Sequence, residues 1–151
     1  MKILMYHYIK DEKKDKFKNL KTLKIEDFEY QLKILKKKFN VLAPSEIKFI
    51  IKNKLKFSSK DFWLTFDDGY IDHYKNVFPL LEKYHFKGSF FPSVNILRYN
   101  KLMDVNVIQL ILSKNINPNN ILKDIENLIK NYKYDLNYYL KKISYNNRFD
   151  N

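Results

Sequence analysis

The sequence predicts an α/β fold in which a parallel sheet occupies the first part of the chain and helices occupy the last. Up to about residue 93, short apolar and aromatic runs alternate with segments of helical periodicity, as is typical of strands joined by helical crossovers. After residue 93, apolar residues recur at helical spacing and no run resembles a strand. We therefore expect residues 1–93 to hold the sheet and residues 94–151 to form a helical extension or insertion.

Each expected element rests on its apolar pattern and on the residues that bound it. The expected strands are residues 3–9, 41–43, 62–66 and 88–92. The expected helices of the first part are residues 25–38, 45–54 and 70–84, and Pro79 should kink or split the last of these. The expected helices of the last part are residues 105–112, 118–130 and 136–143. The first of these is predicted by the helical spacing of the apolar residues Val105, Ile108, Ile111 and Leu112.

Length and composition bound the class of protein. The chain has 151 residues, which suits one domain, and it has no cysteine, which excludes a disulfide framework and a thiol nucleophile. No apolar run approaches 18 residues, so no membrane span is expected. The apolar start is too short for a signal peptide, and we expect a soluble, cytoplasmic protein.

The net charge of +12 comes almost entirely from lysine, because Arg98 and Arg148 are the only arginines. Arginine dominates bidentate recognition of phosphates and guanine, so nucleic acid is not the favoured partner. We interpret the scattered lysines as solvated helix faces, and attraction to an anionic glycan or membrane surface is the alternative.

The stretch from Leu64 to Tyr70 holds the most informative residues. Asp67 and Asp68 are adjacent carboxylates at the end of an apolar strand, and Gly69 permits a sharp turn after them. Neighbouring side chains of a strand point to opposite faces, so the two acids can have different roles. Two close anions favour a bound metal or a basic partner. The alternative is that both acids only cap the following helix.

Three segments resemble the polysaccharide deacetylases, the NodB-type domains of carbohydrate esterase family 4. Residues 65–69, Thr-Phe-Asp-Asp-Gly, match the first motif of that family residue for residue. Residues 88–91, Gly-Ser-Phe-Phe, are similar to the strand that follows the motif, and residues 5–9 are similar to the Tyr-His start of many members. The resemblance covers residues 5–93, with the segments in the right order.

The resemblance implies part of a deformed (β/α) barrel that hydrolyses N-acetyl groups on amino sugars with zinc, cobalt or nickel. Asp67 would be the general base and Asp68 a metal ligand. In parallel β/α folds functional groups gather at the carboxyl ends of the strands. We therefore expect His7, a candidate catalytic residue, to lie within about 10 Å of both acids on one rim, which Ser93 should share.

The sequence departs from the family in its metal ligands. The three histidines are His7, His73 and His85, so the expected His-x-x-x-His motif is missing. A complete barrel takes roughly 200–250 residues. We therefore expect a truncated N-terminal part, with weak or absent metal binding and no activity alone, because one carboxylate cannot hold a catalytic metal. The alternatives are an active enzyme whose C-terminal half comes from another chain, and a non-catalytic lysine-rich module that binds glycan or nucleic acid.

Overall fold

The computed structural model describes residues 1–11, 17, 19–99, 101–114 and 117–131. Contacts along the chain divide it into two units, Met1–Lys114 and Asn115–Asn151. In the second unit, the described residues form α6 (Pro118–Asn131). All other elements belong to the first unit.

The sheet of the first unit is built around one strand, β5 (Asp61–Asp68). β1 (Lys2–Tyr6) pairs with one edge of β5. β4 (Asn40–Val41) pairs with the start of β5 and β6 (Ser89–Pro92) with its end, so these two share the other edge. All the pairings are parallel, and the α/β prediction is confirmed. The strands of the described residues do not close a barrel.

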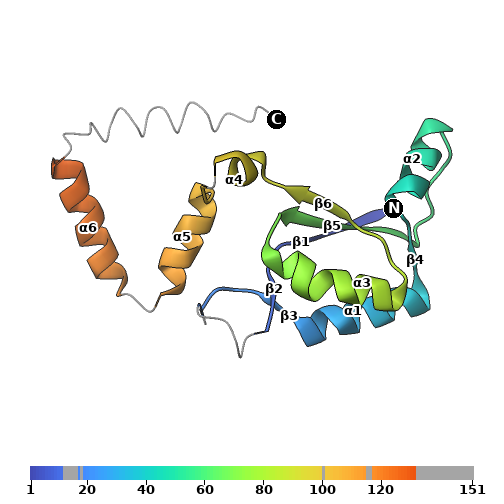
Figure 1. Cartoon of the computed structure of the whole chain (residues 1–151), viewed down its shortest axis with the longest axis horizontal. Helices are drawn as coiled ribbons and strands as arrows, with labels where there is room; N and C mark the ends of the chain where they lie inside the picture. Colours follow the sequence, from blue (N-terminus) through green and yellow to red (C-terminus); the bar gives the residue numbers. More distant parts are fainter. Residues whose placement is uncertain (12–16, 18, 100, 115–116, 132–151) are drawn as a thin grey trace. The chain divides into compact units, whose positions relative to one another are not determined.

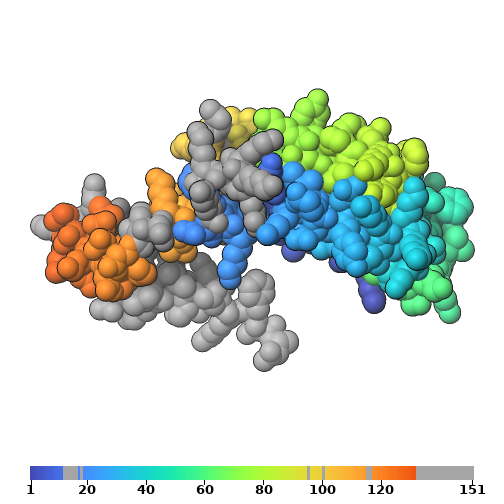
Figure 2. Space-filling model, turned by 90° about the horizontal axis from the view of Figure 1, so that it is seen from below, coloured from blue at the N-terminus to red at the C-terminus, as the bar shows by residue number. Residues whose placement is uncertain are grey.

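Two helices cover one face of this sheet (Figure 1). They are α1 (Ile25–Lys38) and α3 (Phe78–Tyr84), which are seen side by side from the helix side in Figure 2. Their apolar residues pack against the β5 residues that point toward them. The buried core includes Phe28, Leu32, Phe62, Leu64, Phe66, Val77 and Leu81. Burial of one such side chain contributes about 1.5–3 kcal/mol, so this face holds the unit together.

Short pairings that the sequence did not indicate interrupt the expected pattern. The expected strand 3–9 is divided, because β1 ends at Tyr6 and β2 (Ile9–Lys10) pairs in parallel with β3 (Leu23–Lys24) in a separate sheet. Two-residue strands leave no periodic signal in a sequence. α2 (Pro44–Lys52) begins at Pro44, close to the expected start.

The expected helix 70–84 is split in two, as the position of Pro79 suggested. A π-helical turn, η1 (His73–Val77), leads directly into α3. The backbone N–H of Phe78 donates to the carbonyl of His73, five residues earlier. Pro79 has no N–H to continue the α-helical pattern, and the backbone before it takes the wider turn.

After β6 the described residues contain helices and no strand: α4 (Val94–Tyr99), α5 (Asp104–Ser113) and α6. The expected helix 136–143 lies outside the described residues. The first unit extends to Lys114, beyond the expected boundary at residue 93. Within the described part of the chain, no helix has the length and apolar character needed to cross a membrane.

α5 covers the helix expected at residues 105–112, and its apolar side chains face outward. Ile108 and Leu112 are 55% and 63% exposed, whereas Asn106 is only 2% exposed. Val105 and Ile111, which share the helical spacing of these apolar residues, are also exposed. The polar side of α5 packs inward because Asn106 bonds the hydroxyl groups of two tyrosines, Tyr8 and Tyr70.

The sheet face opposite α1 and α3 carries exposed apolar side chains. Ile3, Met5 and Phe91 are 54%, 62% and 50% exposed, and strand register places them on the same face as Trp63. The Trp63 indole N–H donates to the Ser89 hydroxyl at 2.9 Å, which fixes β6 beside β5 on this face. An exposed apolar surface of this kind favours association.

We expect the purified chain to self-associate through this face. Met5→Lys places a charge on it and should lower the average mass in light scattering toward that of one chain. Tyr30→Lys is the matched control, because Tyr30 is 64% exposed on α1, on the opposite side of the sheet. Equal effects of the two variants would show that net charge, rather than this face, governs association.

Candidate active site

The two acids of the motif are the last residues of β5, which therefore runs two residues further than predicted. Asp67 pairs with Phe91 and Asp68 pairs with Pro92 of β6. By strand alternation, Asp67 lies on the face of Trp63, away from the helices. Both acids are partly buried, so each is held at the sheet edge with access to solvent.

A left-handed turn follows the strand. Asp68 has φ +72° and Gly69 has φ +71°. A β-carbon on Gly69 would lie 2.7 Å from the β-carbon of Pro92, so a larger residue would clash as well as strain the backbone. The turn reverses the chain and brings Tyr70 back onto Asp68.

The Tyr70 hydroxyl donates to Oδ2 of Asp68 at 2.5 Å. The Tyr70 ring stacks on Tyr8, with ring centroids 4.1 Å apart. Asn106 of α5 donates from Nδ2 to the Tyr70 hydroxyl oxygen at 2.7 Å and to that of Tyr8 at 3.2 Å. Burial, followed by the hydrogen bond to Asp68, raises the pKa of Tyr70 well above its usual range, so Tyr70 stays a donor.

These contacts explain the orientation of α5. Asn106, Gln109 and Ser113 lie at helical spacings of three and four, so they form one polar stripe. Tyr8 donates to Oε1 of Gln109 at 3.1 Å, and Asn106 bonds both tyrosines. The polar stripe therefore packs against the tyrosines, and the apolar side is left outward. The spacing of these three polar residues is the signal in the sequence for this contact.

His7 immediately follows β1, at the same end of the sheet as the two acids. The parallel register pairs Tyr6 with Phe66, which places His7 level with Asp67. Ser93 follows β6 at this same end. The His7 side chain is exposed. Its approach to within 10 Å of the acids stays a prediction.

His73 is 4% exposed and lies beneath the motif. Its Nε2 bonds the His7 carbonyl oxygen at 2.7 Å, and its ring packs edge-on against Phe66 and Tyr70. Nδ1 is buried without a hydrogen-bond partner. Burial lowers the pKa of His73, which favours the neutral ring. The His73 ring therefore connects η1 to the backbone just after β1.

The described residues do not fit a catalytic metal. Nowhere in the described ranges do three or more His, Cys, Asp or Glu side chains form a cluster that could hold one. Asp68 accepts from Tyr70, and the His73 ring is buried against the His7 carbonyl. About three protein ligands are usual for a catalytic zinc, and Asp68 would supply one.

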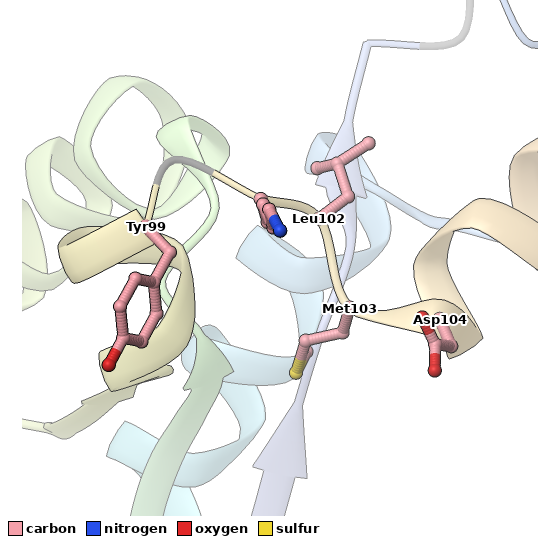
Figure 3. A pocket seen from close by; sticks show the side chains of 5 residues that line it. Tyr99, Leu102, Met103 and Asp104 are labelled. Carbon is pink, nitrogen blue, oxygen red and sulfur yellow. The ribbon is translucent and has the colours of Figure 1, made fainter.

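Two hollows lie near the helices that follow β6. One, of about 560 Å³, is lined by Tyr99 and residues 101–104 and contains none of the predicted site residues. Figure 3 shows Leu102 pointing away from Met103 there. The other, of about 400 Å³, is lined by His7, Tyr8, Lys21 and Gln109 among others. Only the second hollow reaches the predicted site.

Comparisons with known proteins agree with this arrangement. Residues 54–104 match the family model described as polysaccharide deacetylase. YxkH, a polysaccharide deacetylase homologue from Bacillus subtilis (strain 168), is 35% identical over 90 residues, which are 59% of this chain and 30% of YxkH. The Streptococcus pyogenes deacetylase PplD, solved in complex with acetate, superposes with a TM-score of 0.55 and 28% identity, over 74% of this chain and 50% of that one. A de-N-acetylase from Aggregatibacter actinomycetemcomitans superposes with a TM-score of 0.54 and 28% identity, over 67% of this chain and 41% of that one.

The chain carries a polysaccharide deacetylase (NodB-type) region. The matched residues include Asp67, Asp68 and Gly69 and end at Asp104, the first residue of α5. The chain spans 30% of the length of YxkH and 50% of that of PplD. The matched residues thus include the deacetylase motif and the central strand β5 that carries it. The activity of the whole protein is a proposal, which follows below.

Stability of the deacetylase region should fall as pH drops below the ordinary His pKa of 6.5. Burial lowers the pKa of folded His73, so below pH 6.5 the unfolded chain binds a proton that the folded chain excludes. The free energy of unfolding then falls with pH, by at most about 1.4 kcal/mol per unit for this one proton. Urea melts at pH 7.5, 6.5 and 5.5 measure this slope.

His73→Asn should flatten the slope between pH 6.5 and 5.5, although it destabilises the fold at every pH. His85→Gln is the control, because His85 is exposed at the end of α3. An unchanged slope in His73→Asn would contradict the assignment.

Proposed function

We propose that this chain supplies the Asp67–Asp68 edge of a deacetylase site that removes N-acetyl groups from amino-sugar polymers. The observation that carries the proposal is the Thr-Phe-Asp-Asp-Gly motif at the carboxyl end of the central parallel strand. The two carboxylates lie in different surroundings there: Asp68 is bonded to Tyr70, and Asp67 has no side-chain hydrogen bond to another described residue. The similarity to PplD and to the de-N-acetylase supports the same reaction class.

Asp67 is the residue suited to accept a proton. In hydrolysis of an acetamide, water adds to the carbonyl carbon, the carbon–nitrogen bond breaks, and acetate and a free amine form. Asp67 would take a proton from the attacking water, and a proton then reaches the departing nitrogen. Acetate, the ligand in the PplD structure, is the acid that this reaction releases.

We assign His7 to the same edge as a second proton-carrying group. It lies level with Asp67 by strand register and lines the 400 Å³ hollow with Lys21. An imidazole is well suited to exchange protons near neutral pH. The exposed position of His7 and its place in the hollow would let it meet a sugar substrate.

The site needs further residues to be complete. The family resemblance implies a divalent metal, and the described residues do not form its binding site. We propose that zinc, cobalt and nickel bind weakly to this chain, and that the remaining ligands come from a C-terminal half in another chain or from residues outside the described ranges.

Purified residues 1–151 should therefore show no deacetylation of N-acetylglucosamine oligomers above background, measured by release of acetate. Mixing with the C-terminal half of a homologous deacetylase should restore acetate release. In the mixture, Asp67→Asn should lower turnover by at least about 10²-fold, which is the lower end of what general-base catalysis contributes.

Asp27→Asn is the matched control, because Asp27 is an exposed carboxylate of α1, on the sheet face opposite to Asp67, and should leave turnover unchanged. Full activity of the Asp67→Asn mixture would refute its role as base. Metal-dependent deacetylation by the unaided chain would refute the proposal that it is incomplete.

A further inference from the structure

A partly buried chain of hydrogen bonds joins α5 to the motif. It runs from Gln109 to Tyr8, then through Asn106 to Tyr70, and ends on Oδ2 of Asp68. Asn106, at its centre, is 2% exposed. Because these bonds connect three separate parts of the sequence, namely Tyr8, residues 68–70 and α5, they form only in the folded unit.

The direction of each bond follows from counting protons. Each tyrosine hydroxyl has one proton, which Tyr70 gives to Asp68 and Tyr8 gives to Gln109. Both hydroxyl oxygens must then accept, and the two N–H groups of Asn106 are the donors. The reversed amide would place its oxygen against two oxygens whose protons are already committed.

The surroundings of the Asn106 side-chain oxygen show that the N–H groups, and not the oxygen, hold the amide in place. Oδ1 is buried without a hydrogen-bond partner in the described part of the chain. A buried acceptor without a partner is unfavourable, so the amide is held in place through its N–H groups. Leucine would fill a similar volume without donating, and the tyrosine pair would lose the donor that it shares.

We propose that Asn106 is a positioning residue that fixes the Asp68 carboxylate through Tyr70. Asp68 has a left-handed backbone, which is strained for a residue with a β-carbon. With Oδ2 held by Tyr70, the carboxylate has one defined orientation, and Oδ1 is the oxygen left for a ligand of the site. Helix α5 is thereby part of the site. The relevance of this orientation to deacetylation rests on the proposed function, while the orientation itself does not.

The test is NMR spectroscopy of the full chain, with the carboxylate carbons of Asp68 and Asp61 and the backbone amides of residues 67–70 as probes. Tyr70→Phe and Asn106→Leu should shift the Asp68 carboxylate signal in the same direction and raise amide exchange at Asp68 and Gly69 about tenfold, which is what loss of one hydrogen bond allows. The double variant should add little, because both changes break one chain of bonds.

Two references separate positioning from general loosening. Asp61 is at the other end of β5, bonded to Asn40 and Ser58, and its signal should not move. Gln109→Leu removes the partner of Tyr8 from the same helix and should leave Asp68 exchange within about twofold, because the Tyr70 bond remains. An Asp68 signal that is unmoved in Asn106→Leu while α5 stays helical would overturn the proposal. Equal disturbance by Gln109→Leu would overturn it too. No outcome depends on deacetylase activity.

Discussion

β5 pairs with β1 on one edge and with β4 and β6 on the other, and the site residues take their places from this pairing. A strand bonded on both edges cannot shift by one residue without moving its apolar side chains out of the core. Leu64 and Phe66 are fully buried between the sheet and the two helices. The register is therefore fixed, and it fixes the end of the strand at which Asp67 and Asp68 emerge.

The divergence of the two acids is a consequence of this fixed end and of the turn after it. Asp67 is still in regular strand geometry, whereas Asp68 has turned to the left-handed region. The close approach of Pro92 requires glycine at position 69, so the turn cannot relax by substitution. Asp68 is held by Tyr70, whereas Asp67 has no side-chain hydrogen bond to another described residue, as its proposed role as a base requires. Adjacent acids of the same type thus acquire different surroundings from the backbone turn and from Tyr70.

Much of this arrangement could be predicted from the sequence, because local patterns determine it. The order of the main strands and helices, the effect of Pro79 and the position of the acids at a strand end all follow from periodicity and from turn residues. The orientation of α5 could not be predicted from its apolar spacing, since Asn106 bonds Tyr8 and Tyr70, which are 98 and 36 residues away. The π-helical turn and the β2–β3 pairing are also set by tertiary contacts. Only the spacing of Asn106, Gln109 and Ser113 carried a hint of the polar contact.

Amide hydrogen exchange of the whole chain tests most directly whether β5 organises the fold. The amides of Leu64, Thr65 and Phe66 should exchange slowest, through global unfolding, because their strand is paired on both edges and packed under α1 and α3. The amides of α2, which has only Ile47 buried, should exchange faster. β5 amides that exchange as fast as those of α2 would contradict the account, because the acids would then lack a fixed strand from which to project.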